Sequence, residues 1–384
     1  MSDKTVLVLG GGVGGLVASN VLKSKLGRRV NVKLVDQKKV FQFPPSYPWL
    51  MIGKRRPEQV QKDLGLLRKK DVEVFNSVVL SIDIKRSMVK TDKEDISFDY
   101  LIIALGADYA PETIPGFSEH SRHIYNLESA LRFKDAIENF EEGVIAIGIS
   151  RLPYKCPAAP YEVALLLDDY FRKKGVRRKI NFEFFSPEGI PLAAVGQDIG
   201  RTVLEFLRSK EINIRMPMKI TEVRQKELSF ENGETLPFNL LFCVPPHRAP
   251  QPVVDAGLVD GSGWIPVNPK TLETKHGGVY AVGDVTVLPT PNGYMPFLPK
   301  AGVFAHGQAE VVAHNISVEI KGRGKVKEWD GQGSCFLEVG QGKSAFVKGW
   351  FLAEPKPEIE FHMPGRVWHM QKFIFEKYWM HHWF

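Results

Sequence analysis

Residues 5–37 read TVLVLGGGVGGLVASNVLKSKLGRRVNVKLVDQ, and this stretch decides the fold. An apolar strand over Val6–Leu9 leads into closely spaced glycines, a helical pattern follows, and a second strand over Val32–Val35 ends at Asp36. Such glycines allow a tight turn, close approach of the backbone to a pyrophosphate, and close packing of helix on strand. The helix N-terminus adds amide donors, and an acid at the end of the second strand binds ribose hydroxyls. The sequence therefore predicts a dinucleotide-binding unit, with fingerprint glycines Gly10, Gly12 and Gly15.

Two later apolar segments complete this unit. Phe98–Ala107 (FDYLIIALGA) and Gly277–Val285 (GGVYAVGDV) each run into a turn of small residues. The three segments in this order resemble the flavoproteins with two dinucleotide-binding domains. The resemblance implies FAD as cofactor, with Asp284 on its ribityl chain and backbone contacts from Val79 to its adenine; the alternative for Asp284 is a plain turn aspartate. The turn glycines expected at the cofactor are Gly106 and Gly283.

The second glycine fingerprint, which the NAD(P)H-dependent members of that family carry near the middle of the chain, is missing. The matching strand, Val144–Ile149, keeps Gly148 and then enters SRLPYKCPAAPYE. The next strand, Asn181–Phe185, is followed by SPEG, with no acid assigned to the ribose position. We therefore expect a second Rossmann-like unit without a phosphate site, and electrons that do not come from NAD(P)H.

A cysteine motif stands where that fingerprint would be. Residues 156–162 read CPAAPYE, and residues 334–340 read SCFLEVG. Both stretches resemble motifs of the sulfide:quinone oxidoreductases and of the flavin subunit of flavocytochrome c sulfide dehydrogenases, and the likeness extends from Gly10 to Phe351. It implies that Cys156 and Cys335 meet above the flavin as a redox-active pair.

The position of Cys156 before a helical pattern predicts a reactive thiol. A helix N-terminus favours the thiolate, Pro157 suits a first helical turn, and Lys155 adds positive charge. Glu162 lies about one and a half helical turns further on and is expected to move protons near the sulfur. The alternatives are a small buried side chain for Cys156 and a surface acid for Glu162.

The third cysteine, Cys243, follows an apolar strand and is expected in the core. Many quinone-reducing members of the family have a further cysteine roughly 30 residues before Cys156, but SRHIYNLES occupies that region here. We therefore expect a site with two cysteines and non-covalent FAD. The spacing of the cysteines matches no metal site.

The same resemblance suggests residues for the acceptor side. Lys300, in PKAG, matches a lysine at the pyrimidine edge of the flavin; a surface lysine is the alternative. Lys348 and Phe351 match a quinone-pocket pair, for which a strand-end lysine and a core phenylalanine are the alternatives. Further side chains that the sequence suggests for the same cleft are Tyr294, Phe297 and Phe346.

Composition sets the remaining limits. The 384 residues carry a formal net charge of +7, and no nucleic-acid motif accompanies that charge, so we expect no nucleic-acid partner. No apolar run is long enough for a transmembrane helix, and the N-terminus enters a strand directly, so we expect no signal peptide.

Residues 366–384 are rich in aromatic side chains and suit a helix in the lipid head-group layer, with Val367, Met370, Phe373, Ile374, Met380 and Phe384 on one broad face. A helix that packs on its own domain or a second subunit is the alternative.

The sequence thus predicts an α/β protein with two Rossmann-like dinucleotide-binding domains and a C-terminal interface or membrane-binding region. The expected ranges are 1–115 and 251–315 for the FAD-binding domain, 116–250 for the second Rossmann-like domain, and 316–384 for the C-terminal quinone and membrane region.

The expected function is oxidation of sulfide to zero-valent sulfur or polysulfide at the cysteine pair, with two electrons passed through FAD to a membrane quinone. We expect a peripheral (monotopic) membrane protein that forms a homo-oligomer. The alternatives are a sulfide dehydrogenase flavin subunit that reduces a cytochrome c, an NADH:quinone oxidoreductase, and a flavin-binding protein without turnover.

Overall fold

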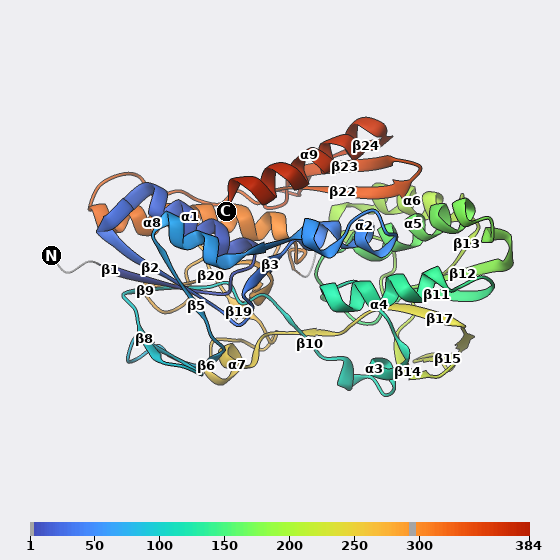
Figure 1. The fold of residues 1–384 in the computed structure, drawn as a ribbon, viewed down its shortest axis with the longest axis horizontal. Coiled ribbons are helices and arrows are strands. Elements are labelled where there is room, and N and C mark those ends of the chain that lie inside the picture. The colour runs from blue at the N-terminus through green and yellow to red at the C-terminus, as the bar shows by residue number, and fades with distance from the viewer. Residues whose placement is uncertain (1–3, 292–296) are drawn as a thin grey trace.

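The computed structural model describes residues 4–291 and 297–384, and a parallel sheet forms the centre of its first unit (Figure 1). The strand order is β20-β9-β1-β2-β5, and every pairing is parallel. The strands predicted around the glycine fingerprint are therefore confirmed as neighbours. The five strands are β1 (Lys4–Leu9), β2 (Val30–Asp36), β5 (Val72–Asn76), β9 (Tyr100–Ile103) and β20 (Val279–Ala281).

Helices α1 (Val13–Leu26) and α8 (Gly302–Lys321) pack together and share one hydrophobic core with this sheet. The turn between β1 and α1 requires glycine at two points. Gly10 has a φ of +97°, and a Cβ atom on Gly15 would lie 1.8 Å from the carbonyl oxygen of Gly10. Gly10 and Gly15 are therefore steric requirements of the turn itself.

Smaller elements surround the first unit. Strands β6 to β8 form an antiparallel sheet, β3 pairs with β4, and β19 pairs with β21. The bounds are β3 (Val40–Gln42), β4 (Gln61–Asp63), β6 (Val79–Asp83), β7 (Met88–Thr91), β8 (Asp95–Ser97), β19 (Ile265–Pro266), β21 (Thr286–Val287), α2 (Tyr47–Met51) and α7 (Gln251–Asp255). Short 3-10 helices cover Gly27–Arg29, Pro44–Ser46, Pro57–Val60, Leu64–Lys70, Pro111–Thr113, Arg177–Lys179, Ala193–Val195 and Gly283–Val285.

The second unit contains the predicted second Rossmann-like sheet. Its strands run parallel in the order β13-β12-β11-β17, and the antiparallel pair β10 and β18 joins it to the first unit. The bounds are β10 (Asp108–Tyr109), β11 (Gly143–Ile149), β12 (Ile180–Phe185), β13 (Ile212–Arg215), β14 (Ile220–Arg224), β15 (Glu227–Phe230), β16 (Thr235–Pro237), β17 (Leu240–Val244), β18 (His247–Arg248), α3 (Phe117–His120), α4 (Leu127–Glu138), α5 (Ala159–Lys174) and α6 (Gln197–Arg208).

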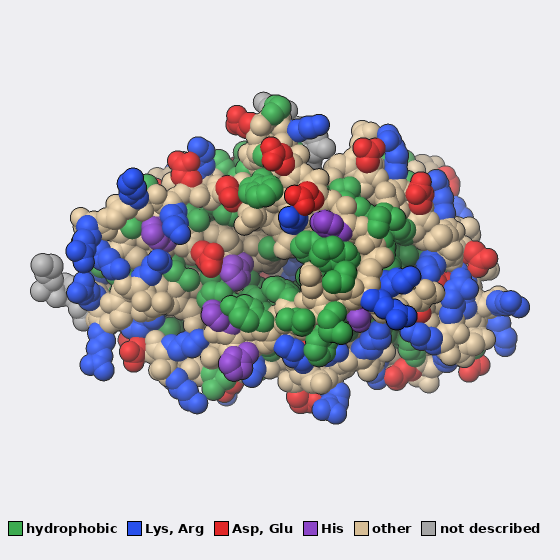
Figure 2. All heavy atoms as spheres, turned by 90° about the horizontal axis from the view of Figure 1, so that it is seen from above, with side chains coloured by type: hydrophobic (Ala, Val, Ile, Leu, Met, Phe, Trp, Pro, Cys, Tyr) green, Lys and Arg blue, Asp and Glu red, His purple; other side chains and the backbone are tan. Residues whose placement is uncertain are grey.

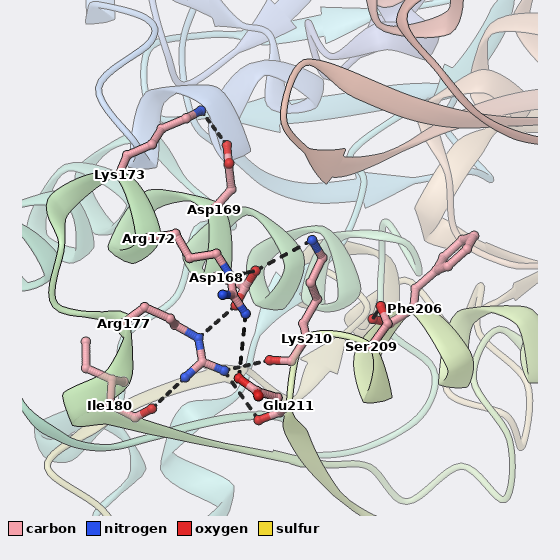
Figure 3. A network of polar contacts seen from close by, with 10 residues as sticks. All are labelled: Asp168, Asp169, Arg172, Lys173, Arg177, Ile180, Phe206, Ser209, Lys210 and Glu211. Carbon is pink, nitrogen blue, oxygen red and sulfur yellow. Dashed lines mark hydrogen bonds and ion pairs between the residues drawn. The ribbon is translucent and has the colours of Figure 1, made fainter.

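A buried carboxylate fixes the C-terminal end of α5 in this unit (Figure 3). Asp168 is fully buried. It pairs with Arg177 at 2.7 Å, with Arg172 at 2.9 Å and with Lys210 at 3.7 Å. The Arg177 guanidinium also donates to the carbonyls of Ile180 and Lys210. The network therefore ties α5 to the start of β12 and to the turn after α6.

The C-terminal region lies across both units (Figure 1). Its antiparallel sheet comprises β22 (Gln332–Gly340), β23 (Lys343–Trp350) and β24 (Glu358–Gly365), and α9 (Arg366–His382) follows directly. Side chains of β22 and β23 join the core of the second unit, whereas Trp379, Met380 and Trp383 join the core of the first. The C-terminal region therefore bridges the two units.

Replacing Asp168 with alanine should destabilise the protein by about 3–5 kcal/mol, because it leaves the buried Arg177 without its carboxylate. Asp198→Ala is the matched control, since the Asp198 side chain is 95% exposed and pairs only with the surface residue Arg201 among the described ion pairs. Urea unfolding of both variants measures the two free energies. Equal stabilities would contradict the role of this network.

Candidate active site

The N-terminus of α1 has open space beside Gly12. Gly12 caps the helix, and a Cβ atom built there would meet nothing within 4 Å. Asp36, at the end of β2, accepts from the backbone amides of Gly11 at 2.6 Å and Lys38 at 2.7 Å. Free amides at a helix start favour an anion, and the carboxylate stands beside them. This arrangement fits the pyrophosphate and ribose of a dinucleotide.

The turn after β20 supplies an unused acceptor. Gly283 has a φ of +76°, and its amide donates to Gln308 at 2.7 Å. Oδ1 of Asp284 is buried without a hydrogen-bond partner among the described residues, and burial raises the pKa of Asp284 although Lys155 and Lys300 act the other way. A buried acceptor requires a donor, and the hydroxyls of a ribityl chain would supply one.

The other residues predicted at the cofactor have less distinctive surroundings. Gly106 lies between β9 and β10 with a φ of +72°, and a Cβ atom there would meet nothing within 4 Å. Val79 begins β6 and pairs with Thr91. The adjacent Val78 is more open, with 41% of its surface exposed. The adenine contact of Val79 stays a prediction.

Lys300 is buried beside the Asp284 turn. Its Nζ donates to the carbonyls of Asp284 at 2.7 Å and Thr286 at 2.9 Å, and it lies 3.4 Å from the ring centroid of Trp264. Burial lowers the pKa of Lys300 to about 7, although the Asp284 charge opposes this shift. Its amine can therefore change protonation near neutral pH, and the surface-lysine alternative is excluded.

Cys156 lies immediately beside Lys300. The Cys156 amide donates to the Lys300 carbonyl at 2.8 Å, and the Cys156 carbonyl accepts from Ala159 at 2.9 Å. Helix α5 begins at Ala159, so Cys156 precedes the helix, and Pro157 does not stand in its first turn as expected. The backbone of Cys156 has a φ of +54°, which is unusual for a residue with a side chain. Neighbouring segments therefore hold the thiol-bearing loop in a fixed conformation.

The structure brings Cys335 to Cys156. Cys335 lies on β22 opposite Val347, and both half-buried thiols pack against the core of the second unit. Burial, the charge of Cys335 and the charge of Glu162 all raise the pKa of Cys156 above its ordinary value. Burial and Glu162 raise the pKa of Cys335 to about 11. The expected low thiol pKa is therefore wrong for the reduced pair, because desolvation outweighs the helix terminus.

Glu162 connects the cysteine pair to α9. Its carboxyl group is 3% exposed, and Oε1 accepts from Lys372 Nζ at 2.8 Å and from the Glu338 amide at 3.0 Å. Lys372 also lies 3.9 Å from Glu338, and Glu338 pairs with Nδ1 of His369 at 2.9 Å. The surface alternative for Glu162 is excluded. The sequence did not predict the roles of Lys372, Glu338 and His369, since no local pattern joins them.

Aromatic side chains and histidines pack together on another side of Cys156. The Tyr125 ring lies edge-on to His247, with 5.6 Å between centroids, and Tyr109 lies 5.2 Å from His247. The Tyr125 hydroxyl and Nε2 of His247 are buried without a partner within 4–291 and 297–384. Burial and then the charge of Cys156 raise the pKa of Tyr125, whereas burial lowers the pKa of His247 to about 3. Tyr125 comes from the SRHIYNLES region, and no local sequence pattern marks it as a neighbour of Cys156.

In the second unit, a side chain fills the space at Gly148, the glycine that remains of the second fingerprint, and leaves no room for a phosphate. A Cβ atom on Gly148 would lie 2.1 Å from Cζ of Phe185. The carboxyl group of Glu188, in SPEG, faces inward and accepts from Tyr161 at 2.6 Å and Ser186 at 3.1 Å. The SPEG segment, to which no ribose-binding acid was assigned, therefore carries an acid that binds the tyrosine of the cysteine motif.

The residues predicted at the quinone have different surroundings. Lys348 is exposed and pairs with Glu360 at 3.0 Å, whereas Phe351 is buried against Phe304 at 4.9 Å. Phe346 stacks on Trp368 at 4.9 Å. Phe297 is half-buried, and Tyr294 lies outside the described residues. These contacts do not test a common quinone pocket, and the role of the set stays a prediction.

Helix α9 has one buried and one exposed side. Trp379 and Met380 are buried, and so is Lys372, although lysine side chains are rarely buried. Met380 is therefore wrongly assigned to the exposed face. The exposed apolar face comprises the α9 residues Val367, Met370, Phe373, Ile374, Phe375 and Tyr378, together with Met363 of β24. In Figure 2 hydrophobic side chains gather in the middle of this side of the molecule, with many Lys and Arg toward its two ends. Within the part of the chain that the structure describes, no helix has the length and apolar character to cross a membrane.

Cys243 is a core residue, as predicted. It lies on β17, fully buried, with a pKa that burial raises well above the ordinary value. The described residues contain no cluster of His, Cys, Asp and Glu that could hold a metal ion.

These features define a flavoprotein-type fold with a cysteine pair, and the chain belongs to the pyridine nucleotide-disulphide oxidoreductase family, whose model matches residues 4–309. It is 27% identical over 374 residues to the mitochondrial sulfide:quinone oxidoreductase of Mus musculus, covering 93% of this chain and 80% of that protein. It is also 27% identical over 403 residues to the sulfide-quinone reductase of Aquifex aeolicus (strain VF5), covering 98% and 90%. The X-ray structure of the sulfide:quinone oxidoreductase from Aquifex aeolicus superposes with a TM-score of 0.90 at 26% identity, covering 98% of this chain and 90% of that one.

The pKa of Cys335 predicts a pH dependence for the reduced protein. With a pKa of about 11, the thiolate fraction should rise about tenfold per pH unit between pH 7 and 10. The rate of Cys335 carbamidomethylation by iodoacetamide, followed by peptide mass spectrometry, should rise in parallel, while the buried Cys243 stays unmodified. A rate that is already constant below pH 8 would contradict the assignment.

Proposed function

We propose that this protein oxidises sulfide at Cys156 and Cys335 and passes two electrons through FAD to a membrane quinone. The observation that carries the proposal is the meeting of the two cysteines, one on the loop before α5 and one on β22, beside the Lys300 and Asp284 turn. The names of the relatives, which are sulfide:quinone oxidoreductases, support it.

The first unit would hold FAD non-covalently. The amides at the start of α1, the Asp36 carboxylate and the unpartnered oxygen of Asp284 match its pyrophosphate, ribose and ribityl groups. Bound FAD supplies the two-electron chemistry. No cysteine precedes Cys156 in the sequence, so the chain lacks the attachment point of the covalent members of the family.

The cysteines perform the sulfur chemistry. Hydrosulfide attacks one sulfur of the oxidised Cys156–Cys335 pair, so a new S–S bond forms, the bond between the cysteines breaks, and the second cysteine leaves as a thiolate. Lys372 favours both thiolates, since its charge lowers the pKa of each cysteine against the effect of burial. Successive additions would lengthen the sulfur chain, which leaves as polysulfide or elemental sulfur.

The acceptor is a quinone and the donor is not NAD(P)H. Phe185 fills the space at Gly148, and the Glu188 carboxyl group is bound to Tyr161, so these residues do not form a second nucleotide site. The quinone would bind near Lys348, Phe351, Phe346, Tyr294 and Phe297. A cytochrome-reducing flavin subunit is the less favoured alternative, because both of the relatives compared above are named for quinone.

The exposed apolar face of α9 would rest on the bilayer and make the protein peripheral (monotopic). Each large apolar side chain that leaves water contributes roughly 1.5–3 kcal/mol, so a few of them suffice for attachment. Basic side chains around the face would meet anionic head groups. Homo-oligomer formation stays a prediction from the sequence.

Cys156→Ser and Cys335→Ser should each retain FAD that acid releases, and each should lose nearly all sulfide-dependent reduction of decyl-ubiquinone. The reason is that neither variant can form the disulfide that hydrosulfide attacks. Cys243→Ala is the control and should keep most activity, because Cys243 lies in the core. Wild-type turnover by either serine variant would exclude the pair, and flavin that stays on the peptide after acid would exclude non-covalent binding.

The variant with both Met370→Glu and Ile374→Glu should no longer sediment with liposomes of phosphatidylcholine and phosphatidylglycerol. Both side chains are more than half exposed, so the fold should tolerate the change. Val326→Glu is the matched control, since Val326 is 68% exposed but lies on the loop after α8. If the double variant still pellets with vesicles and Val326→Glu does not, the bilayer contact lies elsewhere.

A further inference from the structure

Proton release inside the protein is a requirement of the proposed function, on which the following inference rests. Hydrosulfide that becomes zero-valent sulfur loses one proton and two electrons. The electrons leave for the quinone, but both thiols pack against the buried core of the second unit. The proton therefore needs an acceptor beside the sulfur and a route to water.

Glu162 is a buried proton acceptor beside the cysteine pair. Its charge acts on both Cys156 and Cys335, raising the pKa of each. The carboxyl group is itself 3% exposed and cannot exchange protons with bulk water directly. Burial raises the pKa of Glu162, and Lys372 limits the shift, so its carboxylate can bind a proton more readily than a surface acid.

A continuous set of polar contacts leads outward from Glu162. Lys372 Nζ lies 2.8 Å from Glu162 Oε1 and 3.9 Å from Glu338 Oε1. Glu338 Oε2 lies 2.9 Å from Nδ1 of His369, whose side chain is 26% exposed. The Trp49 ring borders both ends of this segment, at 4.9 Å from Lys372 and 5.6 Å from His369. The Glu162–Lys372 and Glu338–His369 contacts are hydrogen bonds, whereas the 3.9 Å between Lys372 and Glu338 must shorten before a proton can cross. The His369 side chain, which is 26% exposed, reaches solvent.

The charges of these groups do not cancel. Two buried carboxyl groups, Glu162 and Glu338, share the single buried ammonium of Lys372. Because an unpaired buried charge is costly, an additional positive charge within this cluster is electrostatically favourable. A purely structural ion pair would need only one carboxylate.

We propose that Glu162, Lys372, Glu338 and His369 form a proton path from the cysteine pair to the surface beside α9. Glu162 takes up, as a proton, the hydrogen that is bound to sulfur. Lys372 gives one of its protons to Glu338 and is reprotonated from Glu162. His369 then takes the proton from Glu338 and releases it to water. Helix α9 thus supplies two of the groups that serve the sulfur chemistry.

The test follows anaerobic reduction of the holoprotein's flavin by sulfide in a stopped-flow spectrophotometer between pH 6 and 9. A positioned proton carrier contributes about 10²–10⁴-fold, so His369→Ala, which keeps the inner part of the path, should slow reduction by on the order of 10-fold. Added imidazole should restore the rate, because the site of His369 opens to solvent. His381→Ala, an exposed histidine on the same helix, should behave as wild type.

Two further variants separate proton transfer from structure. The glutamine of His369→Gln can still donate a hydrogen bond to Glu338, but its amide cannot take up and release a proton. Flavin reduction in this variant should therefore remain slow. Lys372→Arg keeps the positive charge but cannot release a proton, so it should be slow and unaffected by imidazole. Full speed in His369→Gln, or wild-type rate and pH profile in His369→Ala, would overturn the path. A wild-type flavin that sulfide does not reduce would refute the proposed function itself, and with it the source of the proton.

Discussion

The position of the C-terminal region depends on the burial of the Lys372 ammonium against Glu162. An ammonium removed from water without a carboxylate is strongly unfavourable, so α9 can pack only where Lys372 reaches its partner on α5. The same contact brings the backbone of Glu338 to Glu162. It thereby fixes β22, which carries Cys335, relative to the helix that follows Cys156. One ion pair thus positions both halves of the sulfur site.

The two sides of α9 have different tasks because helical geometry separates them. One side carries Lys372 and Glu376 inward, and Glu376 accepts from Ser46 and Arg55 of the first unit. The other side carries the exposed apolar face. A helix held by buried charges can present apolar side chains to a bilayer without collapsing onto its own protein.

The sequence predicted what is encoded locally. The glycine fingerprint, the parallel strands beside it and the core position of Cys243 follow from short-range patterns, and the structure confirms them. The burial of Lys372 could not be predicted, because its partner Glu162 lies 210 positions away in the sequence. From helical periodicity alone, a lysine is expected on the exposed side of the helix. The pKa of Cys156 was misjudged because the helix terminus is visible in the sequence, whereas the surrounding burial is not. Lys348 and Phe351 differ in exposure because Lys348 lies within β23, whereas Phe351 follows the end of that strand and packs against Phe304.

The bridging of both units by β22 has a consequence for how the protein assembles. Glu162 and Glu338 meet across 176 positions of the chain, and contacts between such distant segments form late because the entropy of closing the intervening loop opposes them. Cys156 and Cys335 therefore come together only when both units have folded and the last sheet has docked. During synthesis the two thiols stay apart, so the redox-active cysteine pair can form only after β22 has been synthesised and has docked.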